Sequence, residues 1–218
     1  MLSVVANVLL VLAGGLFLAL QPRIYLDGAA MLLPPQRQPL FRQAVGETGR
    51  AMRYWISGQM ILMLAVGLSS WLVYAWIGLP SAAALALIAG LTNFIPFIGP
   101  FLGAVPAVLV AAGVDMQTAG ITVLAVVLIQ QLESYALAPF VHRKTVQLPP
   151  FVGLFAIVIF GTLFGTLGVL LAVPAAVMLL VLVQRLWVRN TLGYDIDVLG
   201  AEQTDAADAD AARGQERK

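Results

Sequence analysis

Long apolar blocks, rather than a regular alternation of apolar and polar positions, dominate the pattern along the chain. Three blocks have the length of a single membrane-crossing helix, about 20 residues at 1.5 Å rise per residue. They are residues 2–20, 56–77 and 118–137. The first lacks the basic start and small-residue cleavage site of a signal peptide, so we expect a retained span. The pattern predicts an all-α, polytopic membrane protein.

Two further apolar blocks, residues 82–112 and 151–186, are too long for single spans. As straight helices they would run about 46 and 54 Å, well beyond the hydrocarbon thickness. Breaks in such segments free backbone groups that must face protein or water. We therefore expect two broken helical hairpins, each either re-entrant or crossing twice. Prolines and glycines interrupt both blocks, at Pro96, Gly99, Pro100, Gly103 and Pro106 in the first and Gly161, Gly165, Gly168 and Pro174 in the second.

The two interrupted blocks share a short repeat. The sequence Ala-Val-Pro-Ala at residues 104–107 recurs at residues 172–175, each time after a glycine-rich break. Paired interrupted segments indicate a transporter binding site, because broken helix ends offer dipoles and free carbonyls to a solute or ion. Proline and glycine are also common in ordinary membrane helices, which is the alternative. On the first reading, Gly165, Gly168 and Pro174 are gate candidates with backbone roles.

Composition supports the membrane class and excludes several others. The chain is 61% hydrophobic and 11% charged, whereas soluble domains carry about a quarter charged residues. The absence of cysteine excludes disulfides, thiolate metal sites and thiol catalysis. Residues 195–218 hold seven of the eleven acids and predict a disordered cytoplasmic tail beyond a membrane domain of residues 1–194.

The basic residues predict the topology. They cluster in residues 21–55, in residues 138–150 (His142, Arg143 and Lys144) and at Arg189. If both hairpins return to the side they came from, every cluster lies on one face, which the positive-inside rule makes cytoplasmic. We therefore expect a multi-pass protein of the bacterial inner membrane, in contact with the lipid bilayer. Short clusters beside apolar blocks do not fit nucleic-acid binding.

Residues 21–55 form the one sizeable polar connection. Prolines interrupt its first half, and residues 41–54 fit an amphipathic helix at the cytoplasmic interface. A plain connecting helix fits the same residues.

Residues 118–137 contain Glu133, the one acid inside an apolar block. A carboxylate at the centre of a membrane helix costs about 2.5–3.5 kcal/mol on insertion scales, so it is a functional candidate by default. At helical spacing, Gln130, Ser134 and Thr122 share its face, and Gln131 widens this polar stripe. The stripe predicts a proton or cation site used in transport.

A structural role for Glu133 is equally compatible with the sequence. The residue lies only four positions before residue 137, where the apolar block ends. It could therefore reach the membrane interface and pair with Arg143 or Lys144.

A second candidate group surrounds Asn93. Its side chain offers a donor and an acceptor just before Pro96, Gly99 and Pro100, where unpaired carbonyls are expected. The alternative is that Asn93 merely caps the preceding helix. The sequence shows no metal-ligand set, nucleotide fingerprint or catalytic arrangement, so we expect no metal, no cofactor and no enzyme activity.

Three motifs, in this order, resemble the autoinducer-2 exporter family of bacterial membrane proteins, also called PerM-type permeases. They are LTNFIPFIGP at residues 91–100; QQLE at residues 130–133, followed by Pro139 and LPP at residues 148–150; and FGTLFGTLG at residues 160–168, running into Pro174. The resemblance covers about residues 2–186. It implies an integral membrane transporter, with autoinducer-2 export and sodium/proton antiport among the family's named activities. Family members begin with further spans, so we expect this chain to correspond to their C-terminal part.

These observations favour a secondary transporter or exporter of a small solute such as autoinducer-2, with proton or sodium coupling. A sodium/proton antiporter, a passive pore and a non-transporting scaffold or accessory subunit are the alternatives. Gly and Ala throughout the apolar blocks would allow helices of a homo-oligomer to pack.

Overall fold

The computed structural model describes residues 13–17, 19–137, 148–190 and 192. Every regular element within these ranges is helical, which confirms the all-α class. Most of the predicted span 2–20, the basic residues 142–144 and the acidic tail 195–218 lie outside the described residues. The chain divides into two units, residues 1–47 and residues 48–218, which are described separately.

In the first unit, residues 13–17 and 19–20 are helical, and two short helices and the start of a long one follow them. Helix α2 (Pro22–Met31) and the 3-10 helix η1 (Pro35–Arg37) precede the first residues of α3 (Gln38–Ile77). The prolines begin these helices rather than interrupting them, because the first helical N–H needs no partner. An ion pair joins Arg42 on α3 to Asp27 on α2.

Helix α3 is a single helix of 40 residues. The predicted amphipathic helix 41–54 and the predicted span 56–77 are therefore continuous, and treating them as two elements was wrong. No proline lies between Phe41 and Ile77 to end the helix, so its winding continues from the polar stretch into the apolar one.

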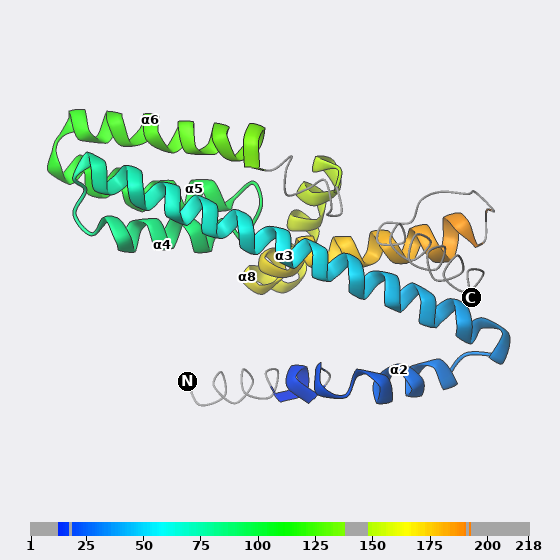
Figure 1. Ribbon diagram of the computed structural model, residues 1–218. Helices are drawn as coiled ribbons and strands as arrows, with labels where there is room; N and C mark the ends of the chain where they lie inside the picture. The colour runs from blue at the N-terminus through cyan, green and yellow to red at the C-terminus, as the bar shows by residue number, and fades with distance from the viewer. Residues whose placement is uncertain (1–12, 18, 138–147, 191, 193–218) are drawn as a thin grey trace, which may run out of the picture. The chain divides into compact units, whose positions relative to one another are not determined.

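The first broken hairpin is formed by α4 (Ala82–Thr92) and α5 (Gly99–Val114), separated by residues 93–98. The two helices pack closely because small residues face each other. A Cβ atom at Gly103 would lie 2.7 Å from the Cα of Ala89, and one at Gly99 would collide with the carbonyl oxygen of Thr92. Figure 1 shows α4, α5 and α6 (Met116–Leu132) alongside the C-terminal half of α3.

The second broken hairpin lies within α8 (Pro150–Leu182), which continues as the π-helical turn η3 (Val183–Arg189). Gly165 has φ 62° and ψ −142°, so the α-helical winding stops there. The chain then turns back on itself and brings Gly168 against Phe160. The two lie so close that a Cβ atom at Gly168 would collide with the carbonyl oxygen of Phe160. Glycine at both positions permits this reversal.

Two hydrophobic clusters hold the second unit together. One joins Ala51 and Trp55 of α3 to both arms of α8, including Ile157 and Val177. The other joins Tyr74 and Leu79 to α4, α5 and α6. The two clusters together show that α3 packs against both hairpins.

Within the described residues, three helical stretches are long and apolar enough to cross a membrane. They are Pro35–Ile77, Met116–Leu137 and Pro150–Arg189. The first two contain the predicted spans 56–77 and 118–137, and the third is the bent second hairpin.

Candidate solute site

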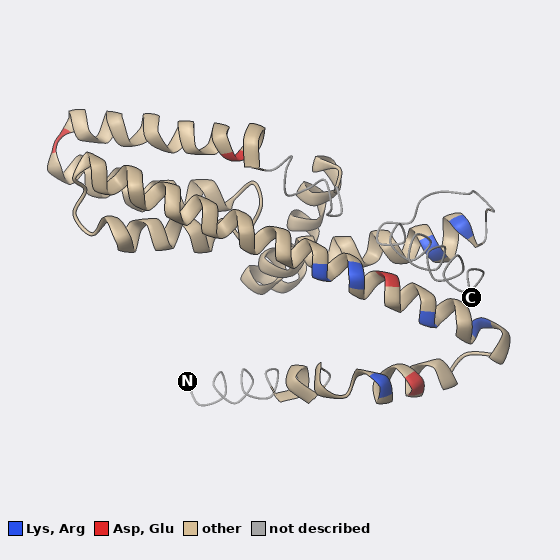
Figure 2. Ribbon diagram, in the orientation of Figure 1, with Lys and Arg blue, Asp and Glu red and all other residues tan. Residues whose placement is uncertain are grey.

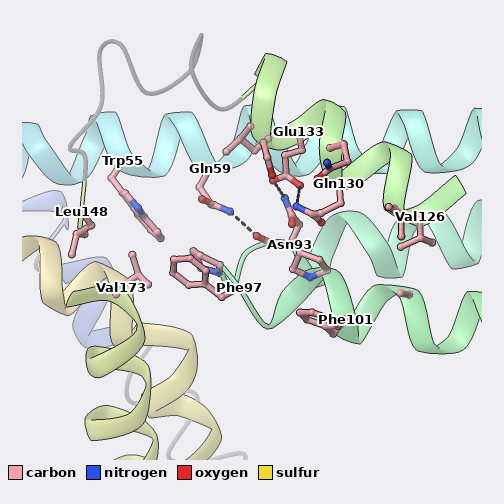
Figure 3. A pocket seen from close by; sticks show the side chains of 18 of the residues that line it. Trp55, Gln59, Asn93, Phe97, Phe101, Val126, Gln130, Glu133, Leu148 and Val173 are labelled. Carbon is pink, nitrogen blue, oxygen red and sulfur yellow. Dashed lines mark hydrogen bonds between the residues drawn. The ribbon is translucent and has the colours of Figure 1, made fainter. Parts of the chain in front are cut away.

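A cavity of about 860 Å³ lies in the second unit, where the first hairpin break meets α3, α6 and α8. Figure 3 shows the side chains of the break pointing into the space between these elements. The cavity has a polar part and an aromatic part. Its polar side chains are Gln59, Asn93, Gln130, Gln131, Glu133 and Ser134, and its aromatic ones are Trp55, Phe97 and Phe101.

Asn93 occupies the centre of the polar part. It stands at the C-cap position of α4, so the capping interpretation describes its backbone correctly. Its side chain does not cap the helix, however: Nδ2 donates a hydrogen bond of 2.9 Å to Oε1 of Glu133. With 3% of its surface exposed, Asn93 ties the first hairpin to the end of α6.

Glu133 is the first residue of the π-helical turn η2 (Glu133–Leu137) that follows α6. Its second oxygen, Oε2, accepts a hydrogen bond of 3.0 Å from Nε2 of Gln130. Both carboxylate oxygens are therefore held by neutral amides. Local π winding is frequent at functional sites, since it re-aims one side chain relative to the regular helix.

The polar stripe predicted on residues 118–137 is brought only partly to the cavity. Gln130, Gln131, Glu133 and Ser134 line it. Thr122 does not, because its hydroxyl is buried and donates to the carbonyl of Thr118 one turn earlier. The proposed partners of Glu133, Arg143 and Lys144, lie outside the described residues.

Gln59 is a cavity residue that sequence reasoning did not select. It is buried on α3, and its Nε2 donates a hydrogen bond of 2.6 Å to the carbonyl oxygen of Asn93. This carbonyl belongs to the break after α4, where a partner from outside the helix is needed. The available signal was a primary amide inside an otherwise apolar span.

The break between α4 and α5 supplies the aromatic part. Phe97 has φ +68°, a left-handed conformation that is costly for a residue with a bulky side chain. Its ring lies against the backbone of α8 at Gly153, where a Cβ atom would be 3.2 Å from Cε2. Trp55 of α3 also packs edge-on against Phe94, with 5.8 Å between ring centroids. The break is thus fixed between α3 and α8.

The gate candidates are separated by the fold. Pro96 and Pro100 line the cavity, and Gly99 supports the break through its contact with Thr92. Gly165, Gly168 and Pro174 do not line it, and Gly165 and Gly168 form the turn of the second hairpin. One residue of each repeat reaches the cavity, Ala104 of the first and Val173 of the second. The break of the first hairpin therefore lines the cavity, whereas the turn of the second does not.

Comparison with known proteins identifies the group to which this helical architecture belongs. Residues 1–187 match the family described as "AI-2E family transporter". The chain belongs to this family. It is a family of membrane transporters and permeases rather than an enzyme class, and its membership together with the apolar helices makes the chain a multi-pass membrane protein.

Individual relatives of this AI-2E family chain are also named as transport proteins or permeases. It is 37% identical over 128 residues to "Putative transport protein YrrI" of Bacillus subtilis, covering 59% of this chain and 36% of that protein. It is 29% identical over 168 residues to "Putative permease PerM" of Escherichia coli K12, covering 75% of this chain and 47% of that protein. The matched region thus spans between about a third and half of these relatives' length. No solved structure matches the chain.

Proposed function

We propose that the chain translocates a small solute across the bacterial inner membrane, and that the cavity around Asn93 and Glu133 is where the solute binds. The hydrogen bond between these two residues carries the proposal. It places a carboxylate and an amide inside a cavity of an otherwise apolar helical protein. Ionisable groups at such positions are rare and mark transport pathways.

Glu133 is the proposed coupling group. Among the described residues its oxygens accept hydrogen bonds from the amides of Asn93 and Gln130, so a proton or cation bound there would compete with these contacts. Such binding would affect the first broken hairpin, because Asn93, at the end of α4, hydrogen-bonds directly to this carboxylate. Proton or sodium coupling of transport would act through this contact.

The proposed direction is export, with autoinducer-2 as the first solute to test, because the matched family is described as an AI-2E transporter family. The proposed topology places the basic end of the second unit in the cytoplasm. Arg50 and Arg53 belong to α3 and Arg185 and Arg189 to η3, whereas Asp115 is the N-cap of α6. Figure 2 shows basic residues (blue) on η3 and the nearby part of α3, and an acid (red) in the turn between α5 and α6, at the other end of these helices. The positive-inside rule favours this orientation.

Homo-oligomerisation is also part of the proposal, and measuring the mass of the purified protein tests it.

The test measures intracellular and extracellular autoinducer-2 in a producing strain whose own exporter is deleted. The strain carries this chain, a version extended upstream of Met1, or Glu133→Gln in each. Asp115→Asn is the matched control, because it removes an acid from the other end of the same helical stretch and keeps a good N-cap.

Export predicts a lower intracellular level with the unmodified protein and the control, and loss of that effect with Glu133→Gln at equal membrane expression. An unchanged ratio in every form would reject autoinducer-2 as the substrate. Membrane vesicles prepared from the same strains then report sodium/proton exchange. If neither solute nor ions move, a scaffold role replaces transport.

A further inference from the structure

We propose that the solute leaves the cavity through a seam between α3, α5 and α6, which is closed in this structure. The seam is defined by the buried residues Ser70, Tyr74, Ala107 and Thr122. The inference rests on the proposed function, because it adds the route that a solute takes from the same cavity to the other side of the membrane.

The position of the cavity along the helices makes such a route necessary. Glu133 follows α6 directly and lies about 25 Å from Met116, the first residue of that helix. Val126, at the edge of the cavity away from Trp55 (Figure 3), is still about 15 Å from Met116. The proposed topology places the Met116 end opposite the cytoplasm, so an exported solute must cross this packed stretch after it has bound.

The walls of the cavity continue along α6 and α3 toward that end. On α6, Val126 lines the cavity, and Thr122 follows on the same face, one turn closer to the N-terminus of the helix. On α3, Leu62 lines the cavity, and Ser70 and Tyr74 follow two and three turns later. Thr122, Ser70 and Tyr74 are all fully buried, so they face the interior of the bundle and not its outer surface.

Helix α5 supplies the third wall. Ala104 lines the cavity, and Ala107 follows one turn later and is fully buried. Ala107, Tyr74 of α3 and Ala119 of α6 belong to one hydrophobic cluster. The three helix faces that enclose the cavity therefore meet beyond it, and Tyr74 is the largest fully buried side chain there.

The hydroxyl groups of the seam suit the passage of a polar solute. Burying a hydroxyl among apolar side chains costs free energy unless it finds a partner. The Thr122 hydroxyl donates a hydrogen bond of 2.8 Å to the carbonyl oxygen of Thr118, and its own oxygen can still accept one. Ser70 and Thr122 each lie about 16 Å along their helix from a polar cavity residue, Gln59 and Glu133 respectively. Hydroxyls at this similar depth would replace hydrogen bonds to water for a solute that passes between them.

The α6 side of the bundle is the side that can open. Helix α4 is held backbone against backbone, because a Cβ atom at Gly90 would lie 2.9 Å from the carbonyl oxygen of Met63 on α3, and one at Gly103 of α5 would lie 2.7 Å from the Cα of Ala89. The seam is closed by side chains instead, and these can change rotamer. Glu133 follows α6 directly, so a change at the proposed coupling group acts on one wall of the seam.

The test follows single thiols, because the chain contains no cysteine. Ser70→Cys and Thr122→Cys place a thiol in the seam with little change in size, and Ala107→Cys replaces either variant that does not elute as folded protein. The reagent is sulfonatoethyl methanethiosulfonate, a membrane-impermeant anion that reacts with thiols in contact with water. It is added to intact cells that produce autoinducer-2 and, separately, to inside-out vesicles made from them. The thiol that has not reacted is measured after denaturation.

Two variants of α6 are the matched controls. Val123 is adjacent to Thr122 but is 46% exposed on the outer surface of the bundle, so Val123→Cys should face lipid and react slowly. Met116 is 83% exposed at the end of the helix, so Met116→Cys should react quickly and report which side of the membrane that end faces.

We expect Ser70→Cys and Thr122→Cys to react from the same side as Met116→Cys, at least tenfold faster than Val123→Cys. Export of autoinducer-2 should stop once either seam thiol has reacted. Reacted Met116→Cys should still export, because its side chain lies outside the seam.

Seam thiols as unreactive as Val123→Cys would overturn the inference and would mean that the hydroxyls only hold the helices together. Reaction at one of the two positions alone, or only from the side opposite Met116→Cys, would also overturn it. Its failure is distinguishable from failure of the proposed function. Export of autoinducer-2 by a chain with unreactive seam thiols refutes only the route, whereas reactive seam thiols in a chain that moves neither solute nor ions refute transport.

Discussion

Asn93 and Glu133 are 40 residues apart in the chain, and Nδ2 of the first lies 2.9 Å from Oε1 of the second. The bond joins the break after α4 to the first residue of the π turn η2. A second bond, from Gln59 to the carbonyl oxygen of Asn93, extends the connection to α3. Three elements of the second unit therefore meet at one asparagine, which makes it the place where a change at the carboxylate can reach a broken helix.

The first prediction concerns the energy of that contact. Asn93→Ala and Glu133→Ala should each lower the free energy of unfolding by about 1–3 kcal/mol, because each removes one partner of the hydrogen bond between them. The loss of unfolding free energy in the double variant should be smaller than the sum of the two single losses by about 0.5–3 kcal/mol. Unfolding of the purified protein in mixed micelles measures all three values.

Asn93→Ala combined with Asp115→Asn is the control for this cycle, since Asp115 stands at the far end of α6. These two changes should be additive within about 0.5 kcal/mol. Additivity of the Asn93 and Glu133 changes as well would mean that the hydrogen bond contributes nothing measurable.

The second prediction separates glycines by what surrounds them. Gly99→Ala and Gly168→Ala should strongly reduce the yield of folded protein, because the new methyl group meets the backbone of Thr92 or Phe160. Gly113→Ala and Gly120→Ala should be neutral or stabilising by up to about 1 kcal/mol, since both lie in helices with open space at the Cβ position. Thermal unfolding followed by size-exclusion chromatography distinguishes them, and equal losses at all four sites would contradict the packing described.

The third prediction concerns the contact between the hairpins. Gly153→Ala places a methyl group 3.2 Å from the Phe97 ring and should displace it. We expect reduced transport with only a small change in stability, because the ring is 43% exposed and has room to move. Adding Phe97→Leu, which removes the ring edge, should restore part of the activity. If the double variant is less active than Gly153→Ala alone, steric displacement of the ring is not the cause.

The fourth prediction is a pH dependence outside the membrane-spanning segments. The Thr118 hydroxyl donates to Asp115, as does the Thr118 backbone N–H, and these bonds hold the pKa of that exposed carboxyl below its ordinary value. A pKa that is lower in the folded state stabilises the fold above the ordinary carboxyl pKa. This stabilisation is lost as pH falls through the lowered value.

The melting temperature of the unmodified protein should therefore fall with pH more steeply than that of Asp115→Asn, which keeps an N-cap but does not titrate. Asp115→Ala should melt lower than both above the ordinary carboxyl pKa. Parallel curves for the unmodified protein and Asp115→Asn would show that this carboxylate contributes no pH dependence.

Much of the architecture follows from the sequence alone. The apolar blocks determined the helical membrane class, because a chain in lipid must satisfy its backbone within helices. Blocks longer than the bilayer and interrupted by proline or glycine had to bend, and both do so, after Asn93 and at Gly165. Glu133 and Asn93 could also be selected from the sequence, because burying a polar group among apolar residues costs free energy unless it is hydrogen-bonded.

Only the tertiary structure decided which of these residues meet. Local pattern cannot show that Asn93 faces Glu133 rather than its own helix, because that contact depends on how α4, α5 and α6 pack through their small residues. Nor can it show that Phe97 lies on Gly153, or that Gln59 serves the break, since both contacts join residues distant in the chain. The similar repeats in the two hairpins suggested equivalent roles, yet the packing brings the first break to the cavity and leaves the turn of the second outside its lining. Periodicity records which face of a helix is apolar, whereas a binding site depends on which faces come together.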